Sequence, residues 1–385
     1  MSWPIPTFPE IEYPKPISLR VWIPTLCTLA LGTAGAVLMI WPHGKPTNTL
    51  LFWATLVGAP LVACALTFGF KLDQWEDEQT DAEEVEKERH RLKGLWRDWS
   101  RRRLCVVDAV AYPAATKEVG KFADPKADLP SWKDRTAEFE LGKNRPATFR
   151  CTRLLHHVAM HFAEALRTRR EVTITLMLDE ASLEHVESWT RRATYIFGRT
   201  IPGVTFHIDP QPASSGAQWI TDLVDRVDPA TRIVVAAQFW ADGKKTHEFS
   251  EGAAAFLIEP DAPQAGAIFR PMASTPDALQ TGLTQIKDYQ VSPERPMLAW
   301  FTRCEEGEST AIRSSVTQDP KDSAAERLLD KPLGLPGPAS GWIALAIAME
   351  AMRGAGPQLV VWREPTADSL HLCTILPLPQ KETTV

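Results

Sequence analysis

Two histidines, His157 and His161, lie four residues apart in a segment with helical periodicity, and Glu164 follows three residues later. On a helix this spacing places two imidazoles and a carboxylate on one face, where they could bind a transition metal. The segment lacks the His-Glu-x-x-His pattern of zinc hydrolases, and the sequence marks no third ligand elsewhere. We therefore expect surface or packed histidines and no cofactor, with a metal site at His157 and His161 as the alternative.

Three carboxylates follow segments with the pattern of buried strands. Asp179 and Glu180 come after residues 172–178, and Asp209 comes after residues 204–208. Catalytic carboxylates of α/β proteins often lie at strand ends, but ordinary turns are polar there as well. The nearby Gly243-Lys-Lys-Thr lacks the upstream glycine of a phosphate-binding loop, so the sequence predicts no nucleotide site there.

Alternating strand and helix periodicities must position these side chains. The predicted strands are residues 104–111, 172–178, 204–208, 233–238 and 253–259, and the predicted helices are residues 151–168, 183–197 and 218–227. Such alternation is typical of an α/β domain. Loops are expected at residues 112–146, 288–296 and 318–338, and no internal repeat is visible at a fixed period.

Four segments in the second half share an order with a known family. Residues 205–217 read as a strand, an Asp and a small-residue elbow entering a helix. Residues 231–238 read as a core strand, 249–259 as a glycine-containing strand, and 334–348 as a glycine-rich loop with its helix. In this order they resemble the β-ketoacyl synthases of the thiolase-like superfamily. The resemblance implies a layered α/β/α soluble domain, and a homodimer or a partner of related fold.

The catalytic groups of that family are missing. There, an elbow cysteine attacks an acyl thioester and two histidines assist. Here the elbow carries Ala213, the Gly-His position reads Leu335-Pro336, and the segment expected to provide the other histidine has none. Ser214 and Ser215 remain at the elbow without an identifiable general base. The resemblance therefore implies a degenerate site with no catalytic residue.

Two uncharged runs, residues 21–41 and 49–70, precede this domain. Each can cross about 30 Å of hydrocarbon at about 1.5 Å per residue, and both exceed the apolar core of a signal peptide. The short connection predicts a hairpin with both termini on one side. The turn carries only Lys45, whereas the segment after the second run has five basic residues, Lys71, Lys87, Arg89, Arg91 and Lys93. The positive-inside rule then predicts that both termini are cytoplasmic.

The sequence therefore predicts four regions. A Pro-rich tail covers residues 1–18, two transmembrane helices lie within 19–71, a charged juxtamembrane helix covers 72–103, and the α/β domain covers 104–385. In the third region Trp96 and Trp99 alternate with arginines. Those rings could contact lipid headgroups or pack on the domain.

Composition narrows the function. The six cysteines are scattered without a Cys-x-x-Cys motif, which suits a reducing compartment, and the net charge of −6 argues against a nucleic-acid partner. We expect a membrane-anchored, non-catalytic adaptor that binds protein partners at the cytoplasmic face of a bacterial inner membrane, with a secretion system as one setting. The alternatives are an acyl-transfer or lipid-modifying enzyme rebuilt around Ser214, Ser215 or Cys304, and an immunity protein whose active part is the membrane hairpin.

Overall fold

The computed structural model describes residues 2–114, 118–124, 126–140, 143–226, 228–243, 246–260, 262, 265–290, 298–316, 321, 326–365 and 368–380. The chain forms two compact units. The hairpin unit comprises Ile5–Leu95, and the α/β domain comprises Met1–Pro4 together with Trp96–Val385. The chain therefore passes from one unit to the other twice.

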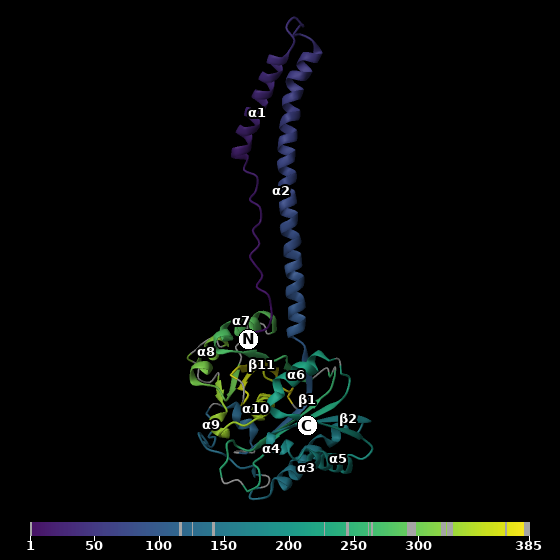
Figure 1. Ribbon diagram of the computed structural model, residues 1–385, viewed down its shortest axis with the longest axis vertical. Helices are drawn as coiled ribbons and strands as arrows, with labels where there is room; N and C mark the ends of the chain where they lie inside the picture. The colour runs from purple at the N-terminus through teal and green to yellow at the C-terminus, as the bar shows by residue number, and fades with distance from the viewer. Residues whose placement is uncertain are drawn as a thin grey trace. The chain divides into compact units, whose positions relative to one another are not determined.

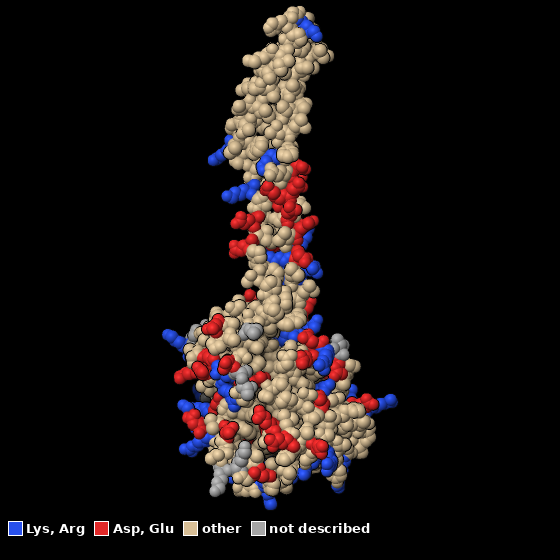
Figure 2. Space-filling model, in the orientation of Figure 1, with Lys and Arg blue, Asp and Glu red and all other residues tan. Residues whose placement is uncertain are grey.

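Two antiparallel helices make up most of the hairpin unit (Figure 1). They are α1 (Leu19–Ile40) and the start of α2 (Leu50–Ser100), and both are long and apolar enough to cross a bilayer. Near the turn the ring of Trp41 packs edge-on against Phe52, with centroids 5.0 Å apart. Trp22 and Phe68 pair in the same way, 6.0 Å apart, at the other end. Side chains along the apolar part of both helices are exposed, and Figure 2 shows almost no charge there.

The same helix continues through the charged segment without a break and ends at Ser100. From Phe70 to Trp96 it rises by 26 residue steps, or about 39 Å at about 1.5 Å per residue. Residues 5–17, which form neither helix nor strand, run back along this segment. The Trp75 indole donates to the carbonyl of Lys15 at 3.1 Å, and the Lys93 ammonium lies 5.7 Å from the Phe8 ring centroid.

The α/β domain contains a mixed sheet with helices on its faces, so the predicted layered α/β architecture is confirmed (Figure 1). Its strands are β1 (Arg103–Pro113), β2 (Glu171–Leu178), β3 (Thr205–Pro212), β4 (Arg232–Gln238), β5 (Gly252–Ile258), β6 (Gly266–Phe269), β7 (Met272–Ser274), β8 (Leu298–Thr302), β9 (Glu326–Leu328), β10 (Gln358–Arg363) and β11 (Leu370–Leu376). Its main helices are α3 (Ala147–Leu166), α4 (Glu180–Leu183), α5 (Val186–Thr200), α6 (Gly216–Asp225), α7 (Leu279–Gln285), α8 (Glu306–Val316), α9 (Asp330–Leu333) and α10 (Ser340–Ala351).

The predicted strands and helices up to residue 259 match observed elements to within a few residues. The prediction of a loop over 318–338 is wrong in part, because β9 and α9 lie inside it. The loop predicted over 288–296 lies largely outside the described residues. Its first three residues, Asp288 to Gln290, end a π-helical turn that continues α7.

The domain is an internal duplication, which the sequence did not show. The strand order is β3-β2-β4-β5-β1 in the first half and β9-β8-β10-β11-β6 in the second. In both halves the third strand runs parallel to the second, the second parallel to the fourth, and the two remaining pairs are antiparallel. The halves join where β1 pairs antiparallel with β6. The two halves therefore share one strand topology although no sequence repeat is visible at a fixed period.

Of the two helices at corresponding places in the halves, α10 lies in the interior, whereas α6 buries only Gly216, Ala217 and Ile220. Residues Gly341 to Met349 of α10 are all buried, as expected for a helix that is apolar all round. They pack with Val234 and Phe256 of the first half and with Trp300 and Val360 of the second. The opposite face of the first-half sheet packs on α3 and α5. Alternating strand side chains therefore supply two separate cores, one on each side of the first-half sheet.

Candidate functional site

The elbow before α6 lacks a reactive side chain at its buried position. Ala213 is 3% exposed and begins a short 3-10 turn that leads into the helix. Ser215 follows in the same turn, and its hydroxyl donates to the carbonyl of Pro212 at 2.8 Å. This local bond orients the Ser215 hydroxyl toward its own backbone.

The helices α6 and α10 approach closely at their N-terminal ends. A Cβ at Gly216 would lie 2.5 Å from Trp342 Nε1, and a Cβ at Gly341 would lie 2.7 Å from Trp362 Cδ1. Glycine is therefore required at both positions by the neighbouring indole rings. The cavity that remains beside Ala213 measures about 10 Å³. This volume is about the minimum that holds one water molecule, and it is far below the roughly 300–1,000 Å³ of a typical ligand pocket.

A second small cavity lies on the other side of α10, near Gln238 and Asp330, and measures about 20 Å³. Asp330 accepts hydrogen bonds from Thr302 Oγ1 at 2.6 Å and from the Arg303 amide at 2.7 Å. Burial raises the pKa of Asp330, and these bonds and the Arg303 charge oppose the rise. Arg303 has a left-handed backbone, with φ of 53°, and the hydrogen bond from its amide to Asp330 stabilises this conformation.

Cys304, the third residue considered for a rebuilt site, lies next to this cluster. Burial raises the pKa of its thiol, and the carboxylates of Asp330 and Glu308 raise it further. The thiol donates to the carbonyl of Thr302, with Sγ and O 3.4 Å apart. A thiol held in its neutral form is a poor nucleophile at neutral pH.

The predicted histidine pair does not converge on a common ligand position. His161 lies 2.9 Å from Asp108, with Nε2 facing Oδ2, and that carboxylate also accepts from Arg353 at 2.8 Å. His157 has a buried Nε2 without a hydrogen-bond partner, and burial lowers its pKa. Within the described residues no group of three or more His, Cys, Asp or Glu side chains has metal-binding geometry.

The strand-end carboxylates serve local structure. Asp179 caps α4, accepting from the Ser182 amide and hydroxyl at 2.9 Å each, and it also accepts from the Phe239 amide at 3.0 Å. It thereby ties the carboxyl ends of β2 and β4. Burial raises the pKa of Asp179, and these hydrogen bonds oppose that rise. The prediction that Asp209 ends a strand is wrong, because β3 continues to Pro212; the half-buried carboxylate accepts from Gln211 Nε2 at 2.8 Å and lies 3.8 Å from Arg232.

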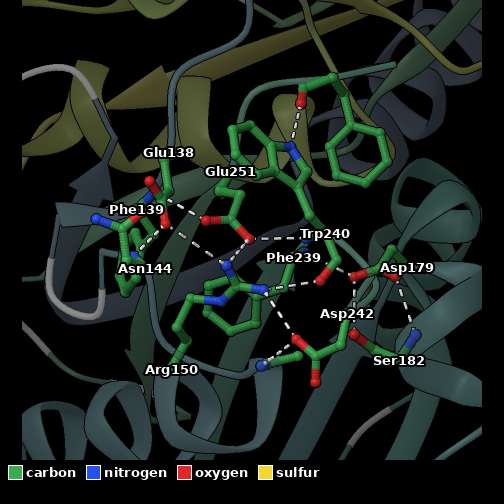
Figure 3. A network of polar contacts seen from close by, with 12 residues as sticks. Glu138, Phe139, Asn144, Arg150, Asp179, Ser182, Phe239, Trp240, Asp242 and Glu251 are labelled. Atoms are coloured by element: carbon green, nitrogen blue, oxygen red, sulfur yellow. Dashed lines mark hydrogen bonds and ion pairs between the residues drawn. The ribbon is translucent and has the colours of Figure 1, made fainter. Parts of the chain in front are cut away.

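A buried ion pair that the sequence did not reveal lies beside this cap (Figure 3). Arg150 of α3 is 3.2 Å from Glu251, which is 2% exposed, and donates to the carbonyl of Trp240 at 2.8 Å. Glu251 also accepts from the amides of Phe139 and Trp240 at 2.8 and 2.7 Å. Glu251 precedes Gly252 in the glycine-containing segment 249–259, whereas Arg150 lies on the buried, apolar face of α3. A charged residue among apolar ones was the feature of the sequence that could have predicted this buried pair.

A larger cavity of about 230 Å³ adjoins this network between the N-terminal turns of α3 and α5. Its walls include Cys151, Trp189, Arg192 and Trp240. The Arg192 guanidinium is held by the hydroxyls of Thr152 and Ser188 at 2.8 and 3.2 Å. Burial raises the pKa of Cys151 to about 12, and the charge of Arg192 opposes the rise, so the cavity carries no reactive thiol at neutral pH.

No family model and no curated protein matches this sequence. Among solved structures, the chain is similar to AbyA1, a tetronic acid condensing enzyme, at 11% identity and a TM-score of 0.45, covering 71% of this chain and all of that one. It is also similar to a variant of OleA from Xanthomonas campestris with cerulenin, at 13% identity and a TM-score of 0.44, covering 72% of this chain and 98% of that one. PksG, an HMG-CoA synthase from Bacillus, matches at 15% identity and a TM-score of 0.44, over 72% of this chain and 80% of its own. At these identities and scores the likenesses assign no activity to this chain.

Proposed function

We propose that this protein is a membrane-anchored, non-catalytic domain of thiolase-like type that binds protein partners as an adaptor. The observation that carries the proposal is the packed interior between the N-terminal ends of α6 and α10. Only about 10 Å³ is left beside Ala213, and the position expected for the nucleophile holds a methyl group. An acyl chain and its thioester have no room there, and no side chain at the elbow is activated to attack one.

The hairpin unit supports the membrane location. Its α1 has no buried residue, and side chains such as Met39 and Leu50 are 86% and 90% exposed. In water such a surface is unfavourable, whereas in a bilayer it is matched by lipid. We further propose that both termini are cytoplasmic, because the turn carries one basic residue and the segment after the second run carries five.

The edge strand β3 supports a self-pairing or partner-pairing role. Among the described strands it hydrogen-bonds only with β2, so the other side of its backbone is open. Pro210 and Pro212 have no amide hydrogen, so another strand would pair along Thr205–Asp209. The proposal includes a homodimer, and light scattering of the full chain in detergent measures its mass.

An electrophilic acyl-thioester probe tests the absence of catalysis. We expect no stoichiometric modification of the full chain at Ser214, Ser215 or Cys304, because the first two lack a base and the thiol is neutral. Mass spectrometry of the digested protein locates any adduct, and the variant Cys304→Ala is the matched control. Modification of a single residue that disappears on substitution to Ala would show that the site is chemically competent.

Two further measurements test the adaptor role and the orientation. Crosslinking of the tagged full chain in native membranes, followed by affinity capture, should retain specific partners that an untagged control does not retain. Capture of nothing beyond the control removes the main support for an adaptor.

In inverted membrane vesicles, protease should digest the α/β domain from outside, and full protection would reverse the proposed orientation.

A further inference from the structure

The third residue of the chain is buried in the α/β domain. Trp3 is 6% exposed, and its carbonyl accepts a hydrogen bond from Gln285 Nε2 at 3.2 Å. Chain termini are usually poorly ordered unless something ties them down. The amino-terminal residues therefore have a specific attachment point on the domain.

The attachment point is an aromatic and cationic cleft at the end of α2. The indole of Trp3 packs edge-on against Trp99, with centroids 5.7 Å apart at 84°. Trp99 in turn packs edge-on against Trp96 at 5.4 Å. The guanidinium of Arg270 lies 4.0 Å from the Trp99 ring centroid, within cation–π range. Trp99 therefore packs on the domain, as one of the two sequence-based alternatives predicted.

The cleft is held in shape by contacts that do not involve Trp3. Arg270 is 2% exposed and is paired with the Asp225 carboxylate through two hydrogen bonds, one of 2.9 Å. Its Nε also donates to the carbonyl of Trp99 at 3.3 Å. Gln290 donates to the carbonyls of Ser100 and Arg270 at 2.8 and 3.1 Å. A receptor fixed in this way loses little freedom when a ligand binds.

We propose that Trp99, Arg270 and Gln285 form a binding site for a Trp-Pro peptide, whose occupant is the chain's own segment of residues 2–4. A buried Trp is the commonest type of interface anchor. Pro4 and Pro6 keep the segment extended before it docks, which lowers the entropic cost. The covalent link through residues 5–18 gives the segment a high effective concentration at the site.

A peptide of residues 1–9 with a fluorescent label at its C-terminus tests this site on the full chain in detergent micelles. The Trp3→Ala chain, whose own segment cannot occupy the cleft, should bind the peptide. The wild-type chain should bind it at least tenfold more weakly, because its cleft is already filled. Adding Gln285→Ala to the Trp3→Ala chain should weaken binding severalfold, since the hydrogen bond to the Trp carbonyl is lost. Fluorescence anisotropy measures all three affinities.

Two controls make the result decisive. The first control is a peptide with Ala in place of Trp3, which should not bind to the Trp3→Ala chain. The second control is the Phe8→Ala chain, which keeps Trp3 and should bind the Trp peptide as weakly as wild type does. Equal binding of the Trp and Ala peptides would exclude a specific site. The measurement uses nanomolar protein, where a second copy of the chain does not fill the cleft. Equal binding of the peptide by the wild-type and Trp3→Ala chains would then show that the chain's own segment does not occupy the cleft.

Discussion

The interior and the periphery of the α/β domain use different chemistry. Between α6 and α10 the contacts are apolar, with Trp342 against Gly216 and Trp362 against Gly341. At the periphery, the shell around this interior where α3 packs on the first-half sheet, the contacts include ion pairs, with Arg150 against Glu251 and Asp108 against His161 and Arg353. Beside Ala213, at the elbow that leads into α6, a cavity of about 10 Å³ remains. The charged residues of the periphery hold helices and loops to the sheet.

The largest expected effect comes from breaking the buried ion pair at the periphery. Glu251→Ala leaves the Arg150 charge buried and removes the acceptor of two backbone amides. We expect a loss of about 3–5 kcal/mol in the free energy of unfolding. Denaturant unfolding of the full chain in detergent, followed by far-UV circular dichroism, measures it. Glu138→Ala, which removes a carboxylate 4.0 Å from Arg150, is the control and should cost much less. A similar small loss for both variants would mean that the periphery is not held by this pair.

A methyl group added in the interior should have the next largest effect. Gly216→Ala places a Cβ 2.5 Å from Nε1 of the Trp342 indole, which is 2% exposed, and should cost about 1–3 kcal/mol. The matched control is Gly198→Ala in α5, where a Cβ meets nothing within 4 Å. That substitution should stabilise the helix by about 0.5–1 kcal/mol. If both variants are stabilised to the same extent, the interior between α6 and α10 is looser than described.

The smallest expected effect is a pH dependence at the second ionic contact of the periphery. Burial by itself would raise the pKa of Asp108, but the hydrogen bonds and charges of His161 and Arg353 lower it from 3.8 to about 2. A depressed pKa stabilises the folded state above pH 3.8, and this contribution is lost as the pH falls toward 2. Because the carboxylate is partly exposed, we expect it to contribute about 1–2 kcal/mol.

The variant Asp108→Asn isolates this contribution. At pH 6 it should be less stable than wild type by that amount, and the difference should shrink to near zero at pH 2. Unfolding curves of both proteins between pH 2 and 6 provide the comparison. A difference that does not change with pH would indicate that Asp108 acts through packing and not through its charge.

Local patterns in the sequence predicted most elements of the first half, because period-two and period-3.6 apolar spacing survives in each segment. The duplication escaped notice because strand order depends on contacts far apart in the chain. One trace is visible in retrospect: Pro212-Ala213-Ser214 and Pro338-Ala339-Ser340 stand at corresponding places, just before α6 and α10. A match of three residues is too short to identify a repeat of about 130 residues without the topology.

The candidate site was predictable only in what it lacks. The resemblance placed Ala213 where the family has a nucleophile, but it did not indicate that indole rings pack beside this elbow. The Arg150–Glu251 pair also required the structure, since its partners are 101 positions apart and single charged residues in a sequence do not reveal their burial. The cleft for Trp3 was missed because a Pro-rich tail suggests a free end.

The attachment of Trp3 has a mechanical consequence. A domain joined to its anchor by one helix can swivel about any flexible point in the connection. Here the chain passes between the two units at two places, Pro4–Ile5 and Leu95–Trp96, and the first crossing is fastened inside the domain. A pull on residues 5–17 would therefore act on Trp3 and on its contacts with Trp99 and Gln285.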